Sequence, residues 1–180
     1  MSDLASPIYP PETPAHIAYY LAVDDVDRRA EAATANGARL VVPPFDAGDQ
    51  GRLATLIDPV GAAFSLWQPH RFAGWSLPPH LAGTPQRMVL ASDQPDRARH
   101  FYRATTGADL ARAEFVTAGS FPPSTRQWEV VIGVDDPDHV VARARDHGAD
   151  VVTWSEKTGR PVVRLSGPER LTCHVRRLES

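Results

Sequence analysis

Few residues of this sequence have the type and spacing that a reactive site requires. A glycine-rich phosphate loop, a Gly-x-Ser-x-Gly elbow, paired Cys-x-x-Cys motifs and a His-Glu-x-x-His helix are all absent from it. The single thiol, Cys173, lies in the apolar run LTCHV, which is typical of a buried, inert cysteine. Six of the seven histidines fall at predicted element ends, in a linker or on helix surfaces: His16, His70, His80, His100, His139 and His147. The seventh, His174, follows Cys173 in a strand-like run, so the elements around it decide what it can do.

Length and composition limit the class of protein. The chain has 180 residues, 42% of them hydrophobic and 23% charged, with a formal net charge of −3 and one cysteine. This balance excludes a disordered chain, a collagen-like chain and a disulfide scaffold. We find neither an apolar stretch of the roughly 18 residues that a membrane helix requires nor the pattern of a secretory signal. The absence of any block of like charges gives no reason to expect nucleic acid or an anionic membrane as a partner, and we expect a cytoplasmic protein.

Three segments of the chain, residues 16–42, 86–110 and 128–152, repeat one pattern. Each consists of an alternating apolar run, an aspartate, a stretch with helical period, a glycine and a second strand-like run. The aspartates are suited to cap the helices, and the glycines to end them in the left-handed conformation. The predicted caps are Asp25, Asp93 and Asp136, and the predicted helix ends are Gly37, Gly107 and Gly148.

The elements around these helices predict β-α-β-β-β units. After Gly37 and again after Gly148, three strand-like runs follow one another, separated by turn residues. The middle copy is shorter, and we expect that it has lost or merged a strand. The predicted organisation is a single unit in residues 1–70, a linker in residues 71–83 and a pair of units in residues 84–180.

This arrangement resembles the vicinal-oxygen-chelate superfamily of glyoxalases, bleomycin-resistance proteins and dioxygenases, in particular its tandem-domain, often metal-free branch. The resemblance is carried by VDDVD at 23–27, by GRLATLIDPVGAAFSLWQP at 51–69, by HFY at 100–102 and by VDDPD at 134–138. It implies an α+β fold in which the mixed sheets of two units pair and curl into an open cup that holds the ligand. Tandem members usually carry four units, so the first of the three units here lacks a mate. We therefore expect a homodimer in which these units complete each other or cap the other chain's cup.

The resemblance also implies which strand positions point into the cup and carry the ligands of metal-dependent members. In the first unit these positions hold Ala18 and Ser65, which cannot usefully ligate a divalent cation. In the other units they hold Gln86, Glu129 and His174, whose side chains could ligate a metal. The shortened second unit offers no fourth-strand ligand, and we expect no metal and no cofactor. Glu129 and His174 are then polar pocket residues or a hydrogen-bonded pair between strands.

Strand alternation assigns the remaining side chains to the two faces of the sheets. Those expected under the helices are Tyr19, Leu21, Val23, Phe64 and Leu66. Those expected to face the cup are Tyr20, Ala22, Ala63, Trp67, Met88, Leu90, Val131, Gly133, Thr172 and Arg176. Such a mostly apolar surface suits a bulky, flat organic ligand. Alternatively, Tyr20 and Trp67 pack against each other or against a partner chain.

We therefore predict a metal-independent protein that binds a hydrophobic aromatic natural product, either to sequester it or to assist in its biosynthesis or in resistance to it. An enzyme is the alternative: a lyase, isomerase or dioxygenase-like member would use Glu129 and His174, with Gln86, around a metal, or one of the two as general base in a dry cup. A structural or interaction module is a third reading. The predicted ligand-binding residues are Tyr20, Trp67, Gln86, Met88, Glu129, Val131, Thr172, His174 and Arg176.

Overall fold

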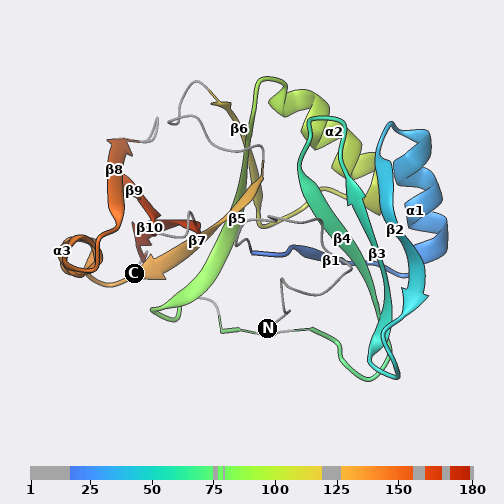
Figure 1. Cartoon of the computed structure of the whole chain (residues 1–180), viewed down its shortest axis with the longest axis horizontal. Coiled ribbons are helices and arrows are strands. Elements are labelled where there is room, and N and C mark those ends of the chain that lie inside the picture. Colours follow the sequence, from blue (N-terminus) through green and yellow to red (C-terminus); the bar gives the residue numbers. More distant parts are fainter. Residues whose placement is uncertain are drawn as a thin grey trace.

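The structure is a computed structural model that describes residues 17–74, 77–78, 80–118, 127–155, 161–167 and 171–178 (Figure 1). His16, residues 75, 76 and 79 of the predicted linker, and the predicted turn residues 168–170 lie outside these ranges. No helix in the described part of the chain combines the length and the hydropathy that crossing a membrane requires. The elements are β1 (Tyr20–Ala22), α1 (Val26–Ala35), β2 (Arg39–Asp46), β3 (Gly51–Ile57), β4 (Ala63–Pro69), β5 (Thr84–Ser92), α2 (Pro95–Thr106), β6 (Ala113–Thr117), β7 (Trp128–Val134), α3 (Pro137–Asp146), β8 (Asp150–Ser155), β9 (Pro161–Ser166) and β10 (Thr172–Arg177).

Two mixed sheets contain the described strands. The four-stranded sheet has the order β1-β4-β3-β2, and the six-stranded sheet has the order β6-β5-β7-β10-β9-β8. In each complete β-α-β-β-β unit the first and last strands are parallel neighbours, β1 beside β4 and β7 beside β10. The predicted α+β class, with repeated units in mixed sheets, is confirmed.

The second unit is the one that the sequence predicts to be shortened. In the described residues it consists of β5, α2 and β6, and β6 lies parallel to β5 in the place that β4 and β10 take in the complete units. Strand β5 also pairs antiparallel with β7, which joins the second and third units into one sheet. The four-stranded sheet, by contrast, contains described strands of the first unit alone.

Local sequence explains where the helices begin and end. Asp25 accepts a hydrogen bond from the backbone of Arg28 and so caps α1, and Asp136 caps α3 in the same way. The predicted cap Asp93 is wrong: Gln94 is the N-cap residue of α2, because Pro95 already occupies the first helical position. Asp93 is therefore one residue too early to cap this helix.

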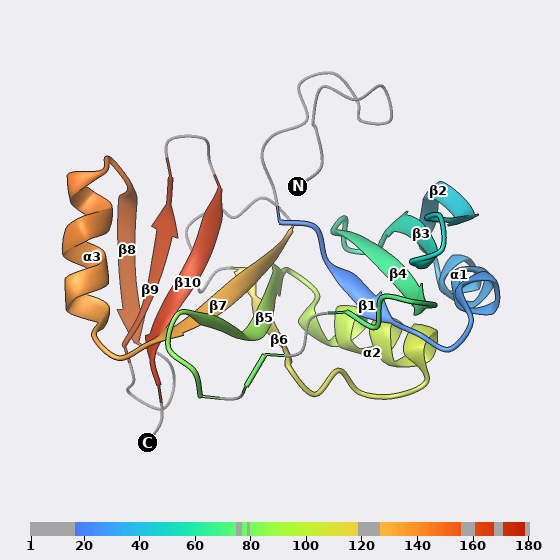
Figure 2. The ribbon, with the colours of Figure 1, turned by 90° about the horizontal axis from the view of Figure 1, so that it is seen from below.

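The main hydrophobic core lies where α1 and α2 meet the two sheets. Phe64 and Phe101 are in edge-to-face contact there, and the same cluster includes Leu90 and Trp128 of the six-stranded sheet. Helix α2 thus packs against both sheets, whereas α3 covers the far end of the six-stranded sheet (Figure 2). The five side chains predicted to lie under the helices belong to this core or pack against it, as expected: Tyr19, Leu21, Val23, Phe64 and Leu66.

A buried hydrogen-bonded chain ties all three units together. The hydroxyl of Tyr102 donates to Asp58 Oδ2 at 2.8 Å and accepts from Trp128 Nε1 at 2.9 Å. Asp58 itself stabilises the turn between β3 and β4 by accepting from the backbone of Val60 and Ala62. Burial raises the pKa of Asp58, although these donors oppose the shift.

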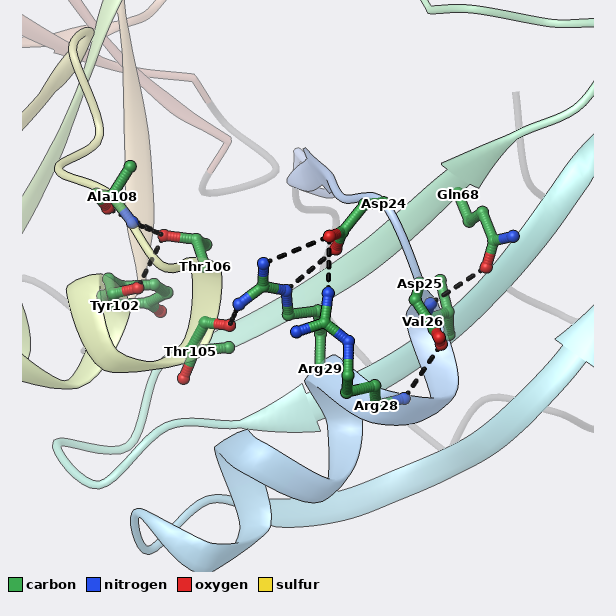
Figure 3. Close-up of polar contacts among 10 residues, drawn as sticks. All are labelled: Asp24, Asp25, Val26, Arg28, Arg29, Gln68, Tyr102, Thr105, Thr106 and Ala108. Carbon is green, nitrogen blue, oxygen red and sulfur yellow. Dashed lines mark hydrogen bonds and ion pairs between the residues drawn. The ribbon is translucent and has the colours of Figure 1, made fainter.

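A second polar contact joins α1 to α2 at the surface (Figure 3). Arg29 of α1 donates to the backbone oxygen of Thr105 near the end of α2, at 3.3 Å, and its Nε donates to Asp24 at 2.9 Å. A Cβ added at Gly107 would lie 3.1 Å from the guanidinium of Arg29, so the glycine allows the arginine to approach. The first unit is therefore held to the second by direct contacts between helices as well as by the linker.

Candidate functional site

Glu129, Arg164 and His174 form an ionic cluster on the face of the six-stranded sheet opposite α3. His174 of β10 is in register with Val131 of β7 and with Arg164 of β9. Because side chains alternate along a strand, Glu129 shares the face of Val131. His174 Nε2 lies 2.5 Å from Glu129 Oε2. Arg164 donates through Nε to Oε2 of Glu129 at 2.9 Å and through Nη2 to Oε1 at 2.7 Å.

The cluster is almost fully buried, with 4% of Glu129 and 1% of His174 exposed. Burial alone would raise the pKa of Glu129, because it penalises the charged carboxylate. The hydrogen bonds from His174 and Arg164 and the charge of Arg164 outweigh this effect and lower the pKa to about 2. The carboxylate is therefore ionised at neutral pH and fully engaged as an acceptor, which makes it a poor general base.

Tyr19, in the segment before β1, brings the first unit against β7, on the face of that strand opposite Glu129. Its ring centroid lies 6.0 Å from that of Trp128, the neighbour of Glu129. Burial raises the pKa of the Tyr19 hydroxyl, and the negative charge of Glu129 adds to the shift. The hydroxyl oxygen is buried without a hydrogen-bond partner among the residues that the structure describes. Sequence reasoning placed Tyr19 only under the helices and missed this contact.

Three further predicted residues lie on the same face as the cluster. Thr172 and Arg176 flank His174 along β10, and Val131 is its neighbour on β7. All three are buried, and Thr172 Oγ1 accepts a hydrogen bond from Gln127 at 3.3 Å. Cys173 points to the other face by alternation, and burial raises the pKa of its thiol. A half-buried thiol with a raised pKa fits the predicted inert cysteine, although the residue is less buried than predicted.

The prediction that Met88 and Leu90 face the cup is wrong. The register of β5 against β7 shifts between Pro85 and Arg87, so that Gln86 is an extra, bulged residue. Beyond the bulge the alternation is inverted, and Leu90 faces the core with Trp128 while Met88 packs against the same core. A one-residue shift exchanges the two faces of a strand.

Gln86 does not join Glu129 and His174. Its Cγ lies over Gly133, where an added Cβ would come within 2.7 Å of it, and its amide donates to Thr84 Oγ1 at 2.9 Å. Gly133 is four residues beyond Glu129 on β7, about 13 Å along an extended strand. The three side chains that the resemblance implied as metal ligands therefore do not converge.

The side chains of this face are more polar than predicted. Arg87 and Glu114, on β5 and β6, form an ion pair beside the buried cluster. Arg164 was missed altogether by the sequence analysis. The available signal was its position between Val163 and Leu165, which face α3. Alternation along the strand places Arg164 on the face opposite these two apolar residues. The sequence alone does not show which strands lie beside β9, and so it does not reveal the contact with Glu129.

The donor set around Glu129 does not fit a divalent metal ion. Arg164 engages both carboxylate oxygens, and His174 Nε2 contacts one of them directly. In the described ranges no group of three or more His, Cys, Asp or Glu side chains is placed to hold a metal ion. Ser65, at the equivalent position of the first unit, pairs instead with Thr55 at 2.9 Å between the hydroxyl oxygens.

The four-stranded sheet carries an aromatic cluster on the face without helices. Tyr20 and Ser65, and likewise Ala22 and Trp67, are register partners, so these side chains share one face. Tyr20 is 52% exposed, and its ring meets that of Trp67 edge to face at 6.1 Å. The ring of Phe72 also packs against that of Trp67, at 6.2 Å between centroids, and the backbone oxygen of Phe72 accepts from Trp67 Nε1 at 3.1 Å.

Further apolar side chains extend this aromatic face. Leu53 is the register partner of Trp67, and Phe45 on the edge strand is the partner of Leu53 and is 44% exposed. A Cβ at Gly51 would lie 2.4 Å from the Trp67 ring, so the glycine leaves room for the indole beside β3. We call Tyr20, Phe45, Leu53, Trp67 and Phe72 the aromatic face.

Comparison with known proteins gives relatives of two kinds. The chain is 32% identical over 151 residues to the putative glyoxylase CFP32 of Mycobacterium bovis, a match that covers 74% of this chain and 58% of the relative. It is 30% identical over 159 residues to the anthracycline biosynthesis protein DauV of a Streptomyces species (77% and 56%), and 30% identical over 167 residues to DnrV of Streptomyces peucetius (82% and 60%). The chain thus spans less than two thirds of the length of these relatives. No family model matches it.

Solved structures share the fold at low sequence identity. The Mn(II)-bound glyoxalase from Novosphingobium aromaticivorans matches with a TM-score of 0.57 and 18% identity, over 89% of this chain and 62% of that one. A 2,2',3-trihydroxybiphenyl 1,2-dioxygenase from Sphingomonas wittichii matches with a TM-score of 0.56 and 12% identity, over 91% and 70%. The repeated units, the mixed sheets and these relatives agree with the resemblance in the sequence. The chain belongs to the vicinal-oxygen-chelate superfamily.

Proposed function

We propose that this protein binds a flat, hydrophobic aromatic natural product without a metal ion, as an accessory to its biosynthesis or as a means of sequestering it. The observation that carries the proposal is the aromatic face, where Tyr20 stands half-exposed against the edge of Trp67. Exposed rings held in a fixed arrangement offer a stacking surface with little ordering cost on binding. The metal-independent part rests on Arg164, which already neutralises Glu129.

The names of two relatives support the chemical class of the ligand. DauV and DnrV are described as anthracycline biosynthesis proteins, and anthracyclines are fused-ring aromatic compounds. A ligand of that shape would match the exposed rings and apolar side chains of the aromatic face better than a small polar metabolite would. On this proposal the protein works in the cytoplasm, where the half-buried thiol of Cys173 would stay reduced.

Fluorescence titration tests the proposal. Adding an anthracycline to the full chain in the presence of EDTA should quench tryptophan fluorescence saturably, with a dissociation constant of roughly tens of micromolar or below. Tyr20→Ala should weaken binding by about tenfold, because it removes one stacking ring. Leu81→Ala is the matched control, since Leu81 is 49% exposed but is not part of the aromatic face. An unsaturable signal, or equal affinity in both variants, would contradict the proposal.

A metal-free enzyme is the second candidate, and one contact favours it. Glu129 Oε2 lies 2.5 Å from His174 Nε2, an arrangement that orients an imidazole as a general base. Only 1% of His174 is exposed, so a substrate would have to displace the groups that cover it. Replacing His174 by Ala separates the two functions: a binding protein keeps its affinity for the aromatic ligand, whereas an enzyme loses turnover.

We also propose that a second copy of the chain covers the aromatic face. In the six-stranded sheet the first strands of two units, β5 and β7, pair antiparallel, but the four-stranded sheet contains described strands of one unit alone. A two-fold axis between two chains would set their first units opposite each other in the same way. The ligand would then lie between two aromatic faces.

A further inference from the structure

Arg164 occupies the place on Glu129 that a cation would need. Its guanidinium contacts both carboxylate oxygens, with N···O distances between 2.7 and 3.2 Å, and its side chain is 11% exposed. It comes from β9, while Glu129 and His174 come from β7 and β10. Three neighbouring strands therefore direct one positive and one negative side chain and one imidazole at a single point.

Distances show that this arrangement and a metal ion exclude each other. A divalent cation such as Zn²⁺ binds an imidazole nitrogen and a carboxylate oxygen at about 2.0 to 2.2 Å each, which sets the two ligand atoms roughly 3 Å or more apart. Here His174 Nε2 and Glu129 Oε2 are only 2.5 Å apart, in direct contact. A metal ion would also lie next to the guanidinium, and like charges repel strongly at a site shielded from water.

We propose that Arg164 is a built-in cation that keeps divalent metal ions away from Glu129 and His174, and that removing its charge opens a metal site at these two residues. The guanidinium stabilises the buried carboxylate without any dependence on metal supply. Arg164 therefore determines which cation neutralises Glu129, namely its own guanidinium and not a metal ion. The inference concerns metal ions and not the organic ligand, so it can fail while the proposed ligand is confirmed, and the reverse.

Metal titration of the full chain tests this inference. Co²⁺ is the probe, because its visible absorption reports the coordination geometry, and calorimetry with Zn²⁺ gives the affinity independently. The wild-type protein should show no saturable binding that depends on His174 up to about 1 mM metal. Arg164→Met, which keeps an unbranched apolar stem but removes the charge, should bind one equivalent of metal with a dissociation constant at least about tenfold below 1 mM.

Matched variants make each outcome decisive. Arg164→Lys keeps a positive charge and should behave as the wild type does, and adding His174→Phe to Arg164→Met should abolish the new site. Arg164→Gln serves as the second uncharged variant if Arg164→Met does not fold as judged by circular dichroism. Binding of Co²⁺ to the wild type that is lost in His174→Phe would overturn the inference. So would a folded, uncharged variant that binds no more tightly than the wild type.

Discussion

At the scale of single residues, the buried charge of Glu129 has the largest energetic consequence. A buried carboxylate is stable only while its donors remain, because neither partner can turn to water instead. The two donors come from β9 and β10, so this one side chain holds three strands in register.

Glu129→Gln should destabilise the protein by about 3 kcal/mol at pH 7, because it leaves the Arg164 guanidinium buried without its counter-ion. Urea unfolding followed by circular dichroism measures the loss. Glu114→Gln is the matched control, since Glu114 pairs with Arg87 and both side chains are about one-third exposed. That change should cost less than about 1 kcal/mol. If both variants lost the same unfolding free energy, the buried cluster would stabilise the protein no more than the exposed ion pair does.

The low pKa of Glu129 predicts a loss of stability in acid. Its pKa is about 2 in the folded protein against an ordinary value of 4.5. A carboxyl whose pKa is lowered by folding stabilises the folded protein at pH values above its unfolded pKa. This stabilisation is lost as the pH falls toward the pKa of the folded protein. The difference in unfolding free energy between wild type and Glu129→Gln should therefore shrink as the pH is lowered from about 5 to about 2. Asp58 is present in both proteins, so its contribution to the pH dependence cancels in this difference. A difference that is constant with pH would refute the assignment.

At the scale of elements, the sequence predicts periodicity well and strand register poorly. The aspartate caps at Asp25 and Asp136 and the side chains under the helices follow from local pattern, and the structure confirms them. The bulge at Gln86 is not visible in that pattern, and it alone inverted the faces of Met88 and Leu90. Arg164 was missed for a related reason, because pairing across three strands is a property of the whole sheet.

The hydrogen-bonded chain through Tyr102 joins an element from each unit. Tyr102→Phe removes the donor to Asp58 and the acceptor of Trp128 Nε1, which leaves two buried polar groups without this partner. The expected loss is about 1 to 3 kcal/mol, measured by thermal or urea unfolding. The same substitution at the exposed Tyr20 should change stability by less than about 0.5 kcal/mol. If Tyr102→Phe were equally neutral, the chain of hydrogen bonds would not hold the units together.

At the scale of the whole molecule, the first unit has no second unit beside it in its sheet among the described residues, and the aromatic face lies on the side of that sheet away from the helices. The six-stranded sheet combines two units, whereas the aromatic face belongs to a unit on its own. Exposed aromatic residues on a sheet face tend to be covered by a ligand or by another chain. On our proposals the aromatic face is covered by both, with the flat ligand held between the aromatic faces of two chains.

The proposed pairing of chains predicts a measurable mass. Size-exclusion chromatography with light scattering at micromolar concentration should give twice the mass of one chain. Trp67→Asp should shift the protein toward the monomer, because it places a charge in the middle of the aromatic face. Asp substitution at Leu81, which is exposed and is not part of the aromatic face, is the control. A wild-type protein that runs as a monodisperse monomer would contradict the pairing.

The position of the ligand, and its independence of metal, can be read from amide chemical shifts. In the full chain, isotopically labelled and kept in excess EDTA, an anthracycline should perturb resonances of β1, β3, β4 and the Phe72 segment in a saturable way. The resonances of Glu129, Arg164 and His174 should move little. Perturbations centred on those three residues, or a need for added divalent metal before any shift occurs, would contradict the account.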